Sequence, residues 1–109
     1  MEDKEMLKKI RAAKFIENNG KVIRAINLLR HKYINLSDVA YAMEKEMSES
    51  EYLDCINFLS EAGYINLRNI RTDEAADLDK YEYTALKAKL SHNGIRLLEG
   101  EIIDKSVRV

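Results

Sequence analysis

Few side chains in this 109-residue chain have the type and spacing that catalysis or metal binding requires. Its one cysteine, Cys55, has no CxxC partner, so we expect a buried and unreactive thiol. His31 and His92 are far apart and fit no metal-ligand spacing. The acidic stretch from Asp73 to Asp79 lacks the glycine and the terminal glutamate of a calcium-binding loop. We therefore expect no enzymatic activity, no cofactor and no metal site.

The chemistry that the sequence does offer is electrostatic. Nine basic and four acidic residues give residues 1–33 a net charge of +5, whereas one basic and seven acidic residues give residues 34–63 a net charge of -6. The rest of the chain is balanced, so the whole carries -1. Such a distribution is typical of solvated helix surfaces, and it also suits partners of opposite charge.

Composition limits the classes of protein to consider. With 46% hydrophobic and 34% charged residues, the chain is typical of a soluble globular protein with one core. No apolar run approaches the roughly 20 residues that a membrane span requires, so we expect no membrane partner. A single cysteine excludes an internal disulfide, and we expect a cytoplasmic protein.

Apolar residues at helical spacing predict helices near 4–18 and 21–32. Gly20 is expected to end the first of them, because the chain has no proline and glycine is its main helix-stop signal. The pattern leaves open whether the second helix is separate or continues the first across a kink.

The best local signal is a capping box, in which Ser48 and Glu51 begin a helix near 48–62 that Gly63 ends. Serine caps predict two further helices near 37–45 and 91–99.

After Gly63 the apolar period changes to two. Residues 64–70 and 82–90 are expected to form an antiparallel hairpin with a long loop, and Lys87 and Lys89 share one face of its second strand. The tail over 102–109 has the alternation of an additional edge strand.

This order of elements resembles a winged helix-turn-helix domain. Four segments carry the resemblance: Leu36-Ser37-Asp38-Val39-Ala40, Met47-Ser48, Phe58-Leu59-Ser60-Glu61-Ala62-Gly63-Tyr64-Ile65 and Lys89-Leu90-Ser91-His92-Asn93-Gly94-Ile95-Arg96-Leu97-Leu98. The last is similar to the family's Leu-Thr-x-x-Gly passage out of the wing, with Ser91 in place of the threonine.

The resemblance implies a single α+β domain over 1–109. An N-terminal helical extension (1–20) would precede a winged-helix core (21–100) with three helices, a two-stranded wing and a short C-terminal helix, followed by a tail (101–109). The family is one of small bacterial or phage-type DNA-binding and regulatory proteins.

In such domains the third helix enters the major groove of DNA. The outward side of the expected third helix has no lysine or arginine, and its three carboxylates oppose binding to a polyanion. The side chains on this outward side are Ser50, Glu51, Asp54, Asn57, Phe58 and Glu61.

Two functions from different classes follow. In the first, the protein is a regulator that binds double-stranded DNA. Most of the contacts come from lysine and arginine side chains outside the third helix. The residues expected to contact DNA are Lys8, Arg11, Lys45, Ser50, Asn57, Arg68 and Arg71.

In the second, the domain is a protein-interaction module without DNA-binding activity. An exposed Phe58 would be its hot spot, flanked by Glu51, Asp54 and Glu61, and it would dock a basic protein partner. The alternative for Phe58 is packing under the wing loop or against the N-terminal helix. The additional amphipathic helix at the start of the chain also predicts a homodimer.

Overall fold

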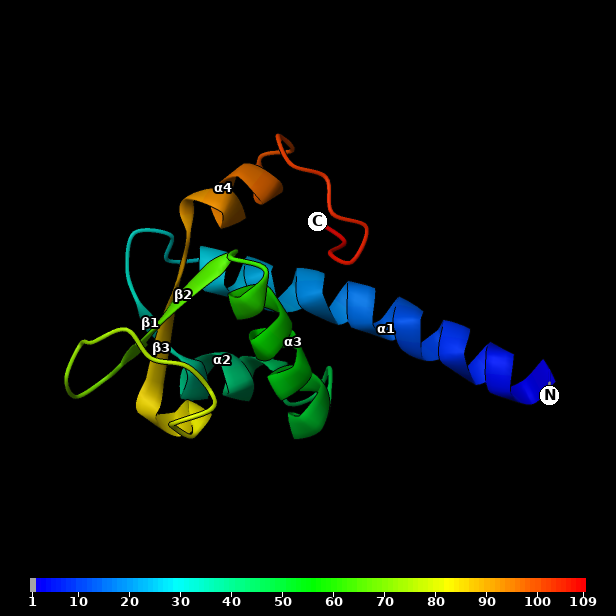
Figure 1. The fold of residues 1–109 in the computed structure, drawn as a ribbon, viewed down its shortest axis with the longest axis horizontal. Helices are drawn as coiled ribbons and strands as arrows, with labels where there is room; N and C mark the ends of the chain where they lie inside the picture. The colour runs from blue at the N-terminus through cyan, green and yellow to red at the C-terminus, as the bar shows by residue number, and fades with distance from the viewer. Residues whose placement is uncertain (1) are drawn as a thin grey trace.

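The computed structural model describes residues 2–109, which adopt an α+β fold (Figure 1). This confirms the expected α+β class. Within these residues, no helix combines the length and the apolar character needed to cross a bilayer. The elements, in chain order, are α1 (Glu2–Asn27), β1 (Ile34–Asn35), α2 (Leu36–Met43), α3 (Glu49–Glu61), β2 (Ile65–Asn69), the 3-10 helix η1 (Tyr83–Ala85), β3 (Leu86–Leu90) and α4 (His92–Leu98).

The first two expected helices are one continuous helix, α1, and the prediction that Gly20 ends the first was wrong. Val22, Ile23 and Ile26 are completely buried on one side of this helix and anchor its second half in the core. Gly20 serves close packing instead: a Cβ at this position would lie 1.8 Å from the carbonyl oxygen of Arg108. Only glycine allows the tail to approach the helix so closely.

The C-terminal tail lies along α1 and does not form the edge strand that its alternation predicts. The Asn19 amide donates to the Ser106 carbonyl at 3.0 Å, and the Arg108 amide donates to the Ile16 carbonyl at 3.2 Å. Arg24 donates to the Arg108 carbonyl at 2.8 Å. These bonds bring the tail beside the middle of α1 (Figure 1).

Helix α3 begins and ends as the sequence predicts. The Ser48 hydroxyl accepts from the Glu51 amide at 3.2 Å, while the Glu51 carboxylate accepts from the Ser48 amide at 2.9 Å. Gly63, which follows the helix, has a φ of +81°. The inward side of α3 is buried, and its Tyr52 hydroxyl donates to the Leu36 carbonyl at 2.7 Å.

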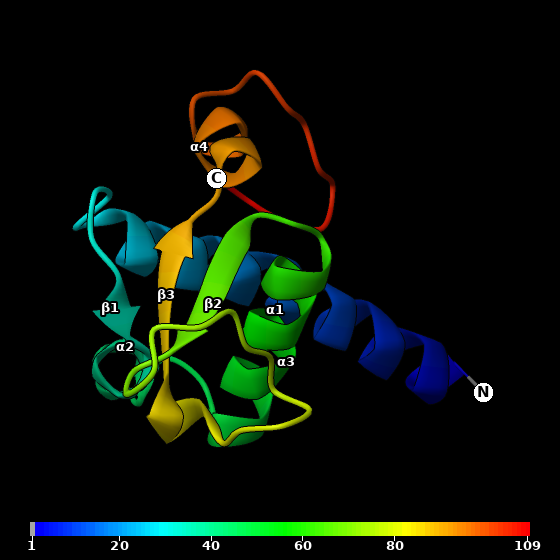
Figure 2. The same ribbon diagram turned by 60° about the vertical axis from the view of Figure 1, so that its left-hand side comes forward.

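In the described part of the chain, residues 2–109, the sheet has three antiparallel strands in the order β1-β3-β2, one more than the expected two-stranded wing (Figure 2). The additional strand, β1, is only two residues long, which is too short for a detectable alternation. The central strand β3 buries Leu86, Ala88 and Leu90 against the helices.

Helix α4 is fixed against the start of β2 by residues 91–94. The Ser91 amide donates to the Tyr64 carbonyl at 3.0 Å, and its hydroxyl donates to the Gly63 carbonyl and accepts from the Gly94 amide. A Cβ on Gly94 would lie 2.0 Å from the Tyr64 carbonyl oxygen. Ser91 therefore supplies the hydrogen bonds between α4 and the start of β2, and Gly94 allows their backbones to approach closely.

Cys55 is completely buried in α3, and burial raises the pKa of its thiol to about 12. This confirms the expected burial of the thiol. Across residues 2–109, no three metal-ligating side chains come together.

Candidate functional site

The outward face of the sheet carries a group of basic side chains. On β3, Lys87 and Lys89 alternate with the buried residues and point away from the core, and Arg68 does the same on β2. The strand register places Arg68 directly opposite Lys87, and Asn66 opposite Lys89. Like charges in directly opposed positions destabilise a sheet, so this arrangement requires compensation.

Part of that compensation is an aromatic ring. The Arg68 guanidinium carbon lies 4.7 Å from the centre of the Tyr33 ring, and the Lys87 and Lys89 ammonium nitrogens lie at 5.5 and 5.9 Å. Three cations thus converge on the ring of one tyrosine, which attracts them through its quadrupole. We call Tyr33, Arg68, Lys87 and Lys89 the basic face.

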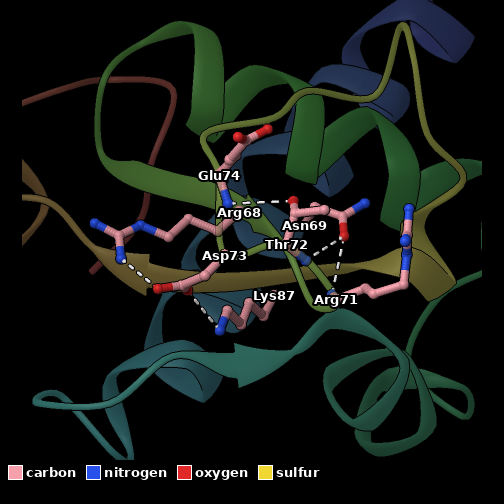
Figure 3. Close-up of polar contacts among 7 residues, drawn as sticks. All are labelled: Arg68, Asn69, Arg71, Thr72, Asp73, Glu74 and Lys87. Atoms are coloured by element: carbon pink, nitrogen blue, oxygen red, sulfur yellow. Dashed lines mark hydrogen bonds and ion pairs between the residues drawn. The ribbon is translucent and has the colours of Figure 1, made fainter.

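A single carboxylate, that of Asp73, pairs with two of these cations (Figure 3). Its oxygens lie 2.8 Å from the Lys87 ammonium and 3.4 Å from the Arg68 guanidinium. The hydrogen bond from Lys87, followed by the charges of Lys87 and Arg68, lowers the pKa of Asp73, so the carboxylate is ionised at neutral pH.

The turn that carries Asp73 is held by Asn69 (Figure 3). The buried side-chain oxygen of Asn69 accepts from the backbone amides of Arg71 and Thr72 at 2.9 and 3.1 Å. The backbone carbonyl of Asn69 accepts from the Asp73 amide at 2.9 Å. Asp73 adopts a φ of +61° within this turn, a conformation in which aspartate and asparagine are enriched among non-glycine residues. The position of the carboxylate is therefore set by the backbone.

The basic face keeps an excess of positive charge. Three cations stand against one carboxylate, and within residues 2–109 the structure gives Lys89 no acidic partner. All three cations are partly buried, so less of the side-chain entropy remains to be lost when they bind an anion. A phosphate group is the ligand that such an arrangement suits, through charge and N–H donors together.

The residues predicted to contact DNA do not form one surface. Arg68 belongs to the basic face, but the Arg71 side chain points in the opposite direction (Figure 3). Lys8 and Arg11 are exposed on the half of α1 that projects away from the sheet (Figure 1). The remaining three, Lys45, Ser50 and Asn57, are exposed on and before α3.

Phe58 is not the free aromatic residue of the interaction-module hypothesis. Its half-buried ring packs edge-on against Phe15 of α1, with ring centres 5.2 Å apart and planes at 79°. Of its predicted acidic neighbours, Glu51 is held in the capping box, whereas Asp54 and Glu61 are exposed. Phe58 was expected to pack either under the wing loop or against the N-terminal helix if it was not free. The structure shows that it packs against the N-terminal helix.

A groove of about 520 Å³ separates α3 from the hairpin loop, residues 70–82, which passes beside this helix (Figure 2). Asp54 and Asn57 line it on the helix side, together with Glu49 and Leu53. The opposite wall is made by residues at the end of the loop and the start of η1: Leu78, Tyr81, Glu82 and Tyr83.

Lys87 and Lys89 share one strand face, as the sequence predicts, but no sequence pattern connects them with Arg68 or Tyr33. The alternation in β3 was a usable signal for the two lysines. Tyr33 had none, because it lies in the connection before the two-residue strand β1 and reaches the cations only through the sheet register.

Comparisons of the chain with protein-family models, with curated proteins and with solved structures give no match. Inferences about function therefore depend on the residues and geometry of the chain itself.

Proposed function

We propose that this chain is a winged-helix protein that binds the phosphate backbone of double-stranded DNA through its basic face. The order of helices and the antiparallel sheet are compatible with a winged helix. The observation that carries the proposal is the convergence of Arg68, Lys87 and Lys89 on Tyr33, where the described residues 2–109 supply only one paired carboxylate.

Helix α3 contributes little to this mode of binding. It contains no lysine or arginine, and the groove beside it is bordered by the hairpin loop. A duplex held through phosphates alone is bound with little sequence preference, because base edges supply specificity. We therefore propose weak and largely sequence-independent DNA binding.

The first test is the salt dependence of binding to a labelled random duplex, followed by fluorescence anisotropy. Neutralising three phosphates releases their counterions, so the affinity should fall roughly 40-fold between about 50 and 200 mM salt. Absence of binding at about 20 mM salt, where charges are least screened, would contradict the proposal.

A charge reversal locates the contact. Lys89→Glu removes a cation that has no carboxylate partner within residues 2–109, and it should reduce the affinity at least about tenfold. The matched control is Lys105→Glu, which makes the same change in net charge at an exposed position of the tail. Equal losses in the two variants would show that net charge alone governs binding.

The groove beside α3 favours a second function, docking of a basic peptide. Its walls bring together three carboxylates, those of Glu49, Asp54 and Glu82, with two tyrosines. One of them, Tyr83, is fixed by edge-on packing against Tyr52 at 5.7 Å. Carboxylates and aromatic faces both attract lysine and arginine side chains.

We test this second function with a lysine-rich peptide and a glutamate-rich peptide of the same length. The lysine-rich peptide should bind, and Glu82→Gln should weaken it several-fold. Glu74→Gln, at an exposed position in the same loop but outside the groove, should not. Equal binding of both peptides would exclude the groove as a site for basic partners, whatever the result with DNA.

A further inference from the structure

A second groove lies next to the one beside α3. It has a volume of about 380 Å³ and is formed by α2, the start of α3 and η1, which lie together at one end of the sheet (Figure 1). We call it the α2 groove, and we call the groove of about 520 Å³ described above the α3 groove. Both are lined by Glu49 and Tyr83, so the two grooves adjoin at these residues.

One side of α2 makes a wall of the α2 groove. Residues that recur three and four positions apart are neighbours on a helix surface, and four of the lining residues follow this spacing: Ser37, Ala40, Tyr41 and Glu44. Tyr41 is 76% exposed, so most of its side chain is open to a ligand.

The other tyrosines of the α2 groove are held in place within the fold. The Tyr52 hydroxyl donates to the Leu36 carbonyl at 2.7 Å, and the Tyr52 ring packs edge-on against Tyr83 with ring centres 5.7 Å apart. Rings that are fixed before binding lose little conformational freedom when a ligand arrives. Aromatic faces also attract cations through their quadrupole, so these rings favour a positively charged ligand.

The charge of both grooves favours the same kind of ligand. Four carboxylates line them: Glu44 in the α2 groove, Glu49 in both, and Asp54 and Glu82 in the α3 groove. Within residues 2–109 none of these four carboxylates forms an ion pair, and no lysine or arginine lines either groove. Cationic side chains of a partner are therefore complementary to both grooves.

We propose that the two adjoining grooves together bind one extended segment of a basic protein, with one cationic side chain in each groove. The inference rests on the second proposed function, the docking of a basic peptide, and adds the number and the spacing of the cations in that ligand. The cation in the α2 groove lies against Tyr41 and near Glu44 and Glu49, where the aromatic ring and the carboxylates both attract it.

The size of the grooves sets the spacing of the two cations. Adjoining cavities of about 380 and 520 Å³ have centres on the order of 10 Å apart, which an extended chain at roughly 3.3 Å per residue spans in about three residues. Lysines about two to four positions apart therefore reach both grooves. Once the first lysine is bound, binding of the second is intramolecular and raises the affinity.

Glycine–serine peptides of equal length, with either one lysine or two lysines at a series of separations, test this spacing by fluorescence anisotropy. The affinity should pass through a maximum at about two to four positions, roughly tenfold above that of the one-lysine peptide. An affinity that is independent of the separation overturns the inference, and the second function stands if Glu82→Gln still weakens binding. Absence of binding by every lysine peptide contradicts the second function itself.

Two substitutions on α2 locate the second lysine. Tyr41→Ala and Glu44→Gln should each remove most of the roughly tenfold gain, and the one-lysine peptide should stay within about twofold because it retains the α3 groove. Both positions are exposed, so the fold should be retained, which circular dichroism checks.

The matched control is Asp38→Asn, which makes the same change in net charge as Glu44→Gln at an exposed position of α2 outside the groove. It should keep the full gain from the second lysine. A gain that persists in both Tyr41→Ala and Glu44→Gln, or that falls equally in Asp38→Asn, overturns the inference.

Discussion

Replacing Gly94 with alanine is expected to lower the melting temperature by roughly 10 °C, which corresponds to about 2–4 kcal/mol. The new methyl group would lie 2.0 Å from the Tyr64 carbonyl oxygen, and this oxygen also accepts the Ser91 amide. The carbonyl cannot move aside without weakening that hydrogen bond. Backbone is displaced less easily than a flexible side chain, so the whole contact between α4 and β2 is affected.

Thermal denaturation followed by circular dichroism measures this effect. The control is Asn93→Ala, which changes an exposed residue in the same turn of α4 and should shift the melting temperature little. If Gly94→Ala melts together with this control, α4 does not approach Tyr64 as closely as the structure shows.

The Asp73→Asn variant is expected to bind duplex DNA about tenfold more tightly than the native chain at low salt. Asp73 occupies two of the three cations of the basic face, so its neutralisation frees Arg68 and Lys87 for phosphate. Asparagine adopts the positive φ of this position as readily as aspartate, so the turn is retained.

The control for this variant is Asp77→Asn, which makes the same change in net charge within the same loop. The Asp77 side chain accepts from the Asp79 amide, and asparagine keeps that acceptor. Anisotropy titrations of both variants decide between a local and a global effect. Equal gains would mean that Asp73 acts only through the net charge of the protein.

Where the signal was local, the sequence was sufficient to predict where a helix begins and ends. The capping box at Ser48 and the stop at Gly63 depend on residues within a few positions of one another, and both are present. Gly20 carries the same kind of signal but has a different role. Its environment is set by Arg108, and no local pattern reports a contact across so much of the chain.

In the candidate site too, the local features could be predicted from the sequence and the long-range contacts could not. Arg68 was identified from its charge, and the two lysines of β3 from their alternation, but their convergence depends on strand register and on Tyr33. Arg71, three positions from Arg68, was expected to act with it and points away instead, because Asn69 turns the backbone between them. Helical spacing placed Phe58 outward and could not show that α1 extends far enough to cover it.

The contact between the tail and α1 has a consequence for synthesis on the ribosome. The bonds from Asn19 to Ser106 and from Arg24 to Arg108 join residues 87 and 84 positions apart. While the chain emerges, the middle of α1 therefore remains uncovered until almost all of the intervening sequence has been translated. During that interval Asn19 lacks the hydrogen-bond partner that it has in the finished fold, and this part of the helix is open to contacts with other chains.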